Sequence, residues 1–194
     1  MARPREFDTD KALQSAMRVF WEQGYRATSL QDLMKAAGVQ KQSLYGAFGN
    51  KRSLFLKCLS LYTKQTLLEV QKMLNEADSA LEGIARVLRF ASQPSDSKKC
   101  PAGCLMANTA LELGLDDPGV AEEIRIMFRG FEKLLGAAVR KAQAQGEVGK
   151  NLDSAAIGEN LANTISGIRI LEKTGAPKQQ VRTVVETALA VIRR

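Results

Sequence analysis

The sequence contains no histidine and only three cysteines in 194 residues. Without imidazole, the chain cannot build a histidine-containing zinc site, a Ser-His-Asp triad or a histidine general base. Three cysteines, an odd number, do not make a disulfide framework. Because the sequence also lacks a paired-carboxylate motif and a glycine-rich phosphate loop, we predict that the protein is not an enzyme and has no cofactor or metal site.

Long apolar runs, internal repeats and low-complexity tracts are missing as well. No apolar run is long enough to span a bilayer, and the N-terminal stretch MARPREFDTDK lacks the apolar core of a signal peptide. These absences predict a cytoplasmic protein without a membrane partner. The hydrophobic content of 45% is sufficient for a packed core.

The net charge of +7 is concentrated at the N-terminal end of the chain. The first 60 residues contain ten Lys or Arg and five Asp or Glu, which accounts for +5 of that total. Such an asymmetry favours a polyanionic partner for the first third of the chain. A solvated basic surface explains the same charge equally well, so charge alone does not decide the function.

Nearly every segment repeats apolar residues at helical spacing, and no alternating strand pattern is present, which predicts an all-α fold. We expect the first helix to begin at Asp8 or Thr9 and to end at Gly24. The second opens at Thr28, with Gln31 as its capping-box partner. A third helix is expected over Gln40–Phe48, a fourth from Asn50 onward, and a fifth that ends at Phe90. The remaining helices are expected over Cys104–Leu113, Pro118–Gln145 and Asp153–Lys173, and from Pro177 to the end.

The stretch from Thr28 to Phe55 carries the strongest functional signal. Two short helices meet at a tight turn around Gly38, and the second of them exposes lysine and glutamine. This pattern is typical of a helix-turn-helix unit, which presents the N-terminus of one helix to base edges in DNA. The side chains expected to face inward from the second of these helices are Val39, Leu44, Ala47 and Phe48.

Residues 8–60 resemble the TetR-type (TetR/AcrR) transcriptional regulators. The resemblance rests on the pattern FWEQGYRATSLQDLMKAAGVQKQSLYGAFGNKRSLF, and a segment like GCLMANTALEL recurs in one branch of that family. It implies a three-helix DNA-binding domain over residues 1–50 and a six-helix ligand-binding and dimerisation domain over residues 51–194, linked by the helix that begins at Asn50. The resemblance also implies a homodimer whose last two helices form a four-helix bundle, and a small-molecule effector of unknown identity.

The predicted partner of the N-terminal domain is a double-stranded, palindromic DNA operator. Lysine suits guanine O6 or N7, and glutamine suits adenine N6 and N7, so Lys41 and Gln42 are candidates for base contacts. Hydroxyl groups, helix N-termini and Lys51 suit phosphates, and an N-terminal arm with Arg3 and Arg5 suits the minor groove. The complete candidate set is Arg3, Arg5, Thr28, Ser29, Gln40, Lys41, Gln42, Ser43, Tyr45, Gly46 and Lys51.

Two further sets of residues are predicted in the C-terminal part. Apolar and small residues on the last two helices are candidates for the dimer interface: Gly158, Leu161, Ala162, Ile165, Val181, Val185, Ala188 and Ile192. Apolar residues with scattered polar groups are candidates for an effector pocket: Phe90, Met106, Asn108, Met127, Phe128, Phe131, Asn160, Asn163 and Thr164.

The segment CPAGC offers an alternative way of sensing. Cys104 is expected near a helix N-terminus with Lys98 and Lys99 close by, and both influences lower the pKa of a thiol. Cys100 is then a candidate resolving partner, so the pair could sense an oxidant, an electrophile or a soft metal. The preferred reading is a ligand-released homodimeric repressor. The alternatives are this thiol-sensing regulator, a helical-bundle enzyme and a non-specific DNA-binding protein.

Overall fold

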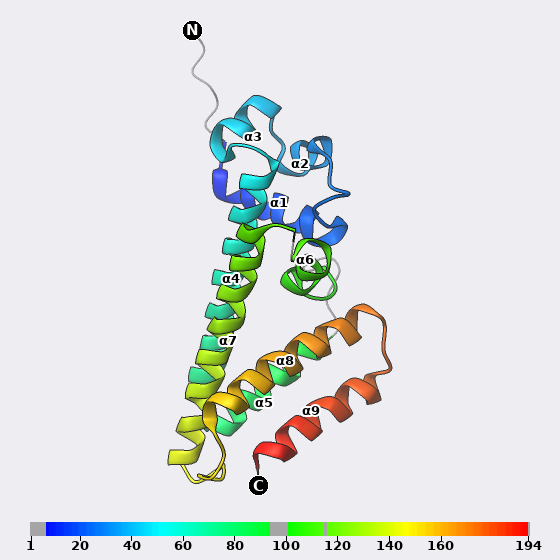
Figure 1. Cartoon of the computed structure of the whole chain (residues 1–194). Helices are drawn as coiled ribbons and strands as arrows, with labels where there is room; N and C mark the ends of the chain where they lie inside the picture. Colours follow the sequence, from blue (N-terminus) through cyan, green and yellow to red (C-terminus); the bar gives the residue numbers. More distant parts are fainter. Residues whose placement is uncertain (1–6, 94–100, 115, 194) are drawn as a thin grey trace.

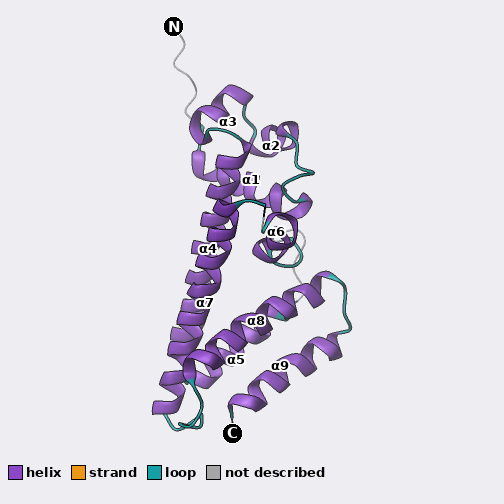
Figure 2. Cartoon of the chain, viewed as in Figure 1, coloured by secondary structure: helices purple, strands orange, loops and turns teal. Residues whose placement is uncertain are grey.

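The computed structural model describes residues 7–93, 101–114 and 116–193, and within them it contains nine helices and no strand (Figures 1 and 2). The all-α prediction is therefore confirmed. The helices are α1 (Thr9–Gln23), α2 (Leu30–Ala37), α3 (Lys41–Phe48), α4 (Lys51–Asn75), α5 (Ala80–Ala91), α6 (Leu105–Leu113), α7 (Pro118–Ala144), α8 (Ser154–Lys173) and α9 (Lys178–Ile192).

Short polar side chains begin most of these helices. The carboxylate of Asp8 accepts hydrogen bonds from the amides of Asp10 and Lys11, and the Asn50 side chain accepts one from the amide of Ser53. Such caps satisfy N–H groups that have no partner inside the helix. The boundaries predicted from Asp8 and Asn50 are thus confirmed.

The start predicted for α2 is wrong by one residue. Ser29, and not Thr28, is the N-cap, and its capping-box partner is Asp32 rather than Gln31. The Ser29 amide donates to Asp32 Oδ2 at 2.8 Å, and the Asp32 amide donates to Ser29 Oγ at 3.1 Å. A carboxylate placed three residues after the cap therefore fixes the start of this helix.

Helices α1, α2 and α3 form a small unit at one end of the molecule, held by the start of α4 (Figure 1). Phe20 of α1 packs edge-on against Phe55 of α4, with 4.8 Å between the ring centroids. Leu33 of α2 and Leu44 of α3 are fully buried in the same core. The apolar stripe of each short helix is therefore covered by its neighbours.

The long helices α4 and α7 run side by side away from this unit, and α5, α8 and α9 complete the other end (Figure 1). Helix α8 crosses α7 very closely. A Cβ atom on Gly158 would lie 2.7 Å from the backbone nitrogen of Gly136, so this crossing requires glycine. None of the described helices combines the length and the apolar character of a membrane span.

Candidate nucleic-acid interface

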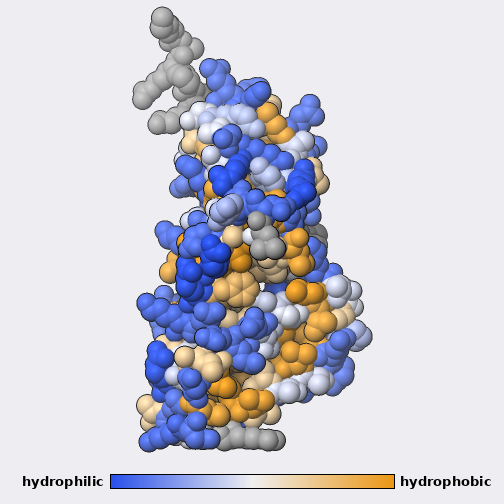
Figure 3. Space-filling model, viewed as in Figure 1, coloured by the Kyte–Doolittle hydropathy of each residue, from blue (hydrophilic) through white to orange (hydrophobic). Residues whose placement is uncertain are grey.

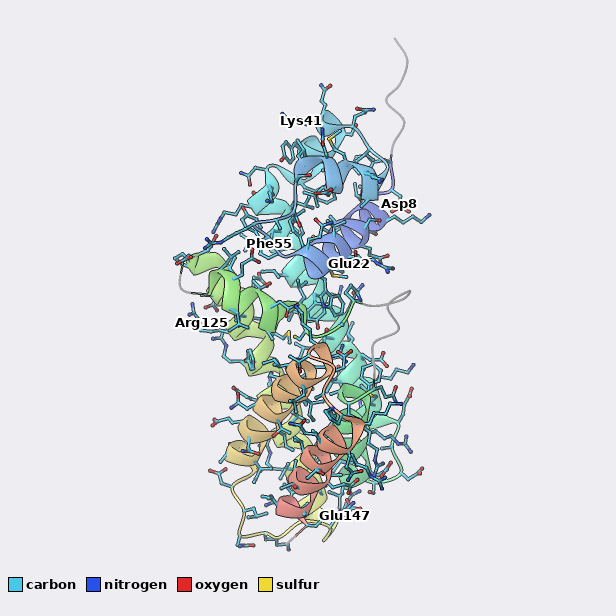
Figure 4. The ribbon with its side chains drawn as sticks, turned by 90° about the vertical axis from the view of Figure 1, so that its right-hand side faces the viewer. Asp8, Glu22, Lys41, Phe55, Arg125 and Glu147 are labelled. Atoms are coloured by element: carbon cyan, nitrogen blue, oxygen red, sulfur yellow. The ribbon has the colours of Figure 1, made fainter. Side chains whose placement is uncertain are left out.

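Helix α3 presents its first turn to solvent at the end of the molecule. Lys41, Gln42 and Ser43 are exposed, whereas Leu44 and Phe48 are buried against the neighbouring helices. Figure 4 shows Lys41 at the opposite end of the molecule from Glu147. The helix is therefore anchored by one face and offers three polar side chains on the other.

The first turn of α3 has no side-chain cap. Gln40 occupies the N-cap position in an extended conformation (φ −77°, ψ 155°), and no cap hydrogen bond is made by its side chain. Gln40 is exposed, as are the next three residues of the first turn. The uncapped N–H groups and the helix dipole make this terminus suitable for an anion. Ala47, expected to face inward, is exposed. It lies at the edge of the face that Leu44 and Phe48 bury, about 60° around the helix from Leu44.

The two hydroxyl residues before α2 differ in their surroundings. Thr28 is only 1% exposed, and its hydroxyl donates to the carbonyl oxygen of Gly24 at 2.6 Å. The prediction that the Thr28 side chain faces DNA is therefore wrong, because the hydroxyl closes the turn after α1. Ser29 is exposed, but its hydroxyl already donates a hydrogen bond to the Asp32 carboxylate.

The remaining candidates lie beside α3. Tyr45 is half-buried, and Gly46 is exposed, with nothing within 4 Å of a Cβ atom added to it. The Lys51 ammonium lies 4.6 Å from the centre of the Tyr25 ring, a cation–π contact that holds this side chain at the start of α4. Arg3 and Arg5 lie outside the described residues.

The structure separates the residues predicted for an effector pocket. Met106, Met127 and Phe131 are buried in the C-terminal core. Phe90 is 51% exposed, and Asn160 and Asn163 are exposed on α8, so the assignment of these three to an interior pocket is wrong. Among the described residues, all three side chains face solvent.

The other polar and aromatic candidates for the pocket differ in burial and in hydrogen bonding. Phe128 and Thr164 are half-buried, and the Thr164 hydroxyl donates to the carbonyl oxygen of Asn160 in its own helix. The side-chain nitrogen of Asn108 is buried without a hydrogen-bond partner among the described residues, as are Trp21 Nε1 and Thr63 Oγ1. These three atoms belong to α6, α1 and α4.

A groove of about 610 Å³ lies elsewhere, between the end of α5 and the last two helices. None of the residues predicted for the pocket lines it. Its lining includes Arg89, Ser92, Glu172, Val181, Val185 and Glu186.

Cys104 is the N-cap residue of α6, close to where the sequence placed it, but it is buried. The hydroxyl of Tyr62 donates to its Sγ atom at 3.5 Å. Burial raises the pKa of the Tyr62 phenol well above its ordinary value. Cys100, Lys98 and Lys99 lie outside the described residues, so the proposed thiol pair stays a prediction.

The residues predicted for the dimer interface are already used inside one chain. Ala188 is half-buried, and the other seven are buried: Gly158, Leu161, Ala162, Ile165, Val181, Val185 and Ile192. Within one chain, Gly158 lies against the α7 backbone at Gly136. The assignment of these residues to a dimer interface stays a prediction. The outer faces of the same helices expose Ile170 (47%) and Val191 (52%).

One set of contacts was missed entirely by sequence reasoning. Carboxylates at the end of α6 and the start of α7 bind Arg26 and Arg52 and two backbone amides of the α1–α2 turn. The partners are 65 to 90 residues apart along the chain. No local pattern in the sequence indicates such a pairing.

Two protein-family models match this chain. A family model described as "Bacterial regulatory proteins, tetR family" matches residues 12–58, and one described as "Tetracyclin repressor-like, C-terminal domain" matches residues 80–191. The HTH-type transcriptional repressor ComR of Escherichia coli is 32% identical over 188 residues, which cover 96% of this chain and 90% of ComR. The HTH-type transcriptional regulator YezE of Bacillus subtilis is 30% identical over 193 residues, 99% of this chain and 100% of YezE.

Among solved structures, a cysteine mutant of the TetR family transcriptional regulator CifR, complexed with 26-bp double-strand operator DNA, has a TM-score of 0.85. It is 32% identical and covers 98% of this chain and 100% of its own. With both domains matched in order and relatives aligned over almost their full length, the chain belongs to the TetR family of bacterial transcriptional regulators.

Proposed function

We propose that the protein is a homodimeric repressor that binds a palindromic DNA operator through α3. The observation that carries this proposal is the uncapped, exposed first turn of α3, where Lys41 and Gln42 stand free on a helix anchored by Leu44. Lysine and glutamine at the start of a recognition helix have the donors and acceptors that base edges in the major groove require. The DNA complex of the similar CifR mutant supports this assignment.

Phosphate contacts surround this turn in the proposed complex. The candidates are the exposed side chains of Gln40 and Ser43, the Tyr45 phenol, and Lys51 at the start of α4. The open space over Gly46 allows the backbone to approach the groove wall. Arg3 and Arg5 are retained as candidates for the minor groove. Because DNA is the proposed partner, we also infer that the protein acts in the cytoplasm.

The proposed dimer uses the outer faces of α8 and α9. Ile170 and Val191 are exposed there, and Figure 3 shows apolar side chains gathered over the half of the molecule that holds these helices. The helix-turn-helix end is mostly hydrophilic in the same view. Two copies are required because one helix-turn-helix unit reads few bases, and a two-fold dimer matches half-sites about 34–36 Å apart.

An effector is proposed to act in the interior of the C-terminal domain. The support is the side-chain nitrogen of Asn108, which is buried and has no hydrogen-bond partner among the described residues. Met106, on the same helix, is fully buried. A buried donor without an acceptor is unfavourable, so a ligand oxygen or an ordered water would stabilise it. Effector binding then shifts the population between two dimer conformations.

Selection of bound sequences from a random DNA pool tests the proposal. A palindromic consensus supports the operator-binding dimer, enrichment without a consensus supports a non-specific DNA-binding protein, and no binding excludes both. On the selected duplex, Lys51→Ala is expected to weaken binding to all sequences and to reduce the salt slope by about 1. Lys41→Ala and Gln42→Ala are expected to change base preference by about 1–3 kcal/mol at single positions.

A further inference from the structure

The connection between α6 and α7 holds the helix-turn-helix unit by its backbone. Glu112, in the last turn of α6, accepts a hydrogen bond from the amide of Tyr25 at 2.8 Å and another from the amide of Arg26 at 2.6 Å. Each oxygen of the carboxylate takes one amide. A carboxylate with two N–H donors is a charge-assisted arrangement, stronger than bonds between neutral groups.

The turn that Glu112 binds is the point from which α2, and then α3, begins. Gly24 opens it with φ 82°, and a Cβ atom there would lie 2.9 Å from Glu112 Oε2. The Thr28 hydroxyl closes the turn onto the Gly24 carbonyl. Glycine is therefore needed at this position for two reasons, its backbone conformation and the close approach of the carboxylate.

Two ion pairs extend the same contact. The Arg26 guanidinium donates to Asp116 at 2.7 Å, and the Arg52 guanidinium donates to both oxygens of Asp117 at 2.6 and 2.7 Å. Asp117 also caps α7 through the amides of Gly119 and Val120. One acidic segment thus binds both the α1–α2 turn and the first turn of α4.

The opposite end of α6 is fastened to α8. The amide of Gly103 donates to Glu172 at 2.8 Å, and Arg169 Nη2 donates to the Gly103 carbonyl at 2.8 Å. Helix α6 has nine residues and is therefore about 13 Å long at 1.5 Å per residue. Buried Met106 holds it in the core. A short, rigid helix consequently joins α8 to the DNA-binding unit.

We propose that Glu112, Asp116 and Asp117 are the positioning residues through which α6 sets the orientation of the recognition helix. Glu112 is the main one, because both of its bonds are to backbone, whereas the Arg26–Asp116 pair is well exposed to solvent. A displacement of α6 moves the carboxylate and carries the turn, α2 and α3 with it. The inference rests on the proposed function, since the orientation matters only if α3 reads DNA.

Hydrogen exchange of the full-length protein without DNA gives the first test. Glu112→Gln leaves one oxygen acceptor, so at least one of the amides of Tyr25 and Arg26 loses its partner and should exchange about tenfold faster. Glu122→Gln is the matched control, because the Glu122 carboxylate also takes two hydrogen bonds, but only from side chains of α7. Unchanged exchange at both amides in Glu112→Gln would overturn the proposal, whatever the protein binds.

The second test uses the duplex selected from the random pool. Coupling is reciprocal, so operator binding to the wild type should slow exchange over residues 103–110 and 168–173 by about fivefold or more. Glu112→Gln should still bind the duplex but lose this remote response, and Glu122→Gln should keep it. A remote response in Glu112→Gln equal to that of the wild type would contradict the proposal.

The outcomes distinguish a failure of the proposed function from a failure of the proposed role of Glu112. If no duplex is selected, the proposed function fails while the exchange result at Tyr25 and Arg26 still decides whether Glu112 holds the turn. Should Glu112→Gln not fold, Asp117→Asn takes its place, because asparagine caps a helix as well as aspartate does but lacks the charge that binds Arg52. It should reduce the remote response by about half or more, and an undiminished response would contradict the proposal.

Discussion

The ion pair between Arg52 and Asp117 should stabilise the folded protein more than the pair between Arg26 and Asp116. Both join the α6–α7 connection to the DNA-binding unit, but their geometry differs. Arg52 donates two parallel bonds to Asp117, whose side chain is 18% exposed. Arg26 makes one bond to Asp116, and the two side chains are 63% and 67% exposed.

The expected magnitudes follow from this geometry. Exposed ion pairs contribute about 0.2–1 kcal/mol, and bidentate pairs are the stronger ones. Because Arg52 is itself 50% exposed, water screens its pair with Asp117. We therefore expect a coupling energy of about 1 kcal/mol for Arg52–Asp117 and about 0.3 kcal/mol or less for Arg26–Asp116.

Double-mutant cycles measured by urea unfolding provide the assay. Arg52→Gln and Asp117→Asn form the first cycle, in which asparagine preserves the cap on α7. Arg26→Gln and Asp116→Asn form the control cycle. Equal coupling energies in the two cycles would refute the reasoning from geometry, and so would a larger value for Arg26–Asp116.

The same pair has a defined pH dependence. The Arg52 guanidinium and the amides at the start of α7 lower the pKa of Asp117 from 3.8 to about 2. A depressed carboxyl pKa contributes stability that is fully present above the unfolded value and is lost as pH falls through the folded value. The Asp117 contribution should therefore persist down to about pH 4 and disappear towards pH 2, and the difference between wild type and Asp117→Asn should shrink over that range.

Three further outcomes are expected. Leu44→Ala should lower the free energy of unfolding by about 2–5 kcal/mol, because Leu44 is fully buried under α3; urea titration measures this. Gly24→Ala should cost about 1–3 kcal/mol in the same assay, owing to its positive φ and the contact with Glu112. Val191→Glu should dissociate the proposed dimer at micromolar concentration in sedimentation experiments without unfolding the monomer, since Val191 is exposed.

Local features of the fold were predictable because they depend on neighbouring residues. Asp8, Asn50 and Asp153 begin helices where the sequence places them, since a cap acts on amides two or three residues away. The error at α2 arose from a choice between adjacent hydroxyl residues. Thr28 and Ser29 both suit an N-cap, and only the tertiary turn decides that the Thr28 hydroxyl bonds to Gly24.

Predictions about which face of a helix is covered were less successful. Helices α8 and α9 have apolar residues on more than one side, and periodicity does not say which side meets the chain's own core. The small residues of α8 were assigned to a partner, but the close α7–α8 crossing uses Gly158 and leaves Ile170 outside. The position of Gly136 in another helix, which the local sequence does not reveal, determines that choice.

The Glu112 contact shows why a resemblance to a family leaves part of the site unknown. The segment GCLMANTALEL contributes to the resemblance, yet its single glutamate has the sequence context of an ordinary exposed helical residue. Its role follows from partners 86 and 87 residues away, and those partners are backbone amides, which have no side-chain signature. The sequence reflects this contact only through the glycine at position 24, which lacks the Cβ atom that would approach the carboxylate. The position of Gly24 at the end of α1 already explains that glycine. Gly24 therefore has two structural roles, but the sequence indicates only its role at the end of α1. The contact between the two domains becomes visible only when both are placed in space.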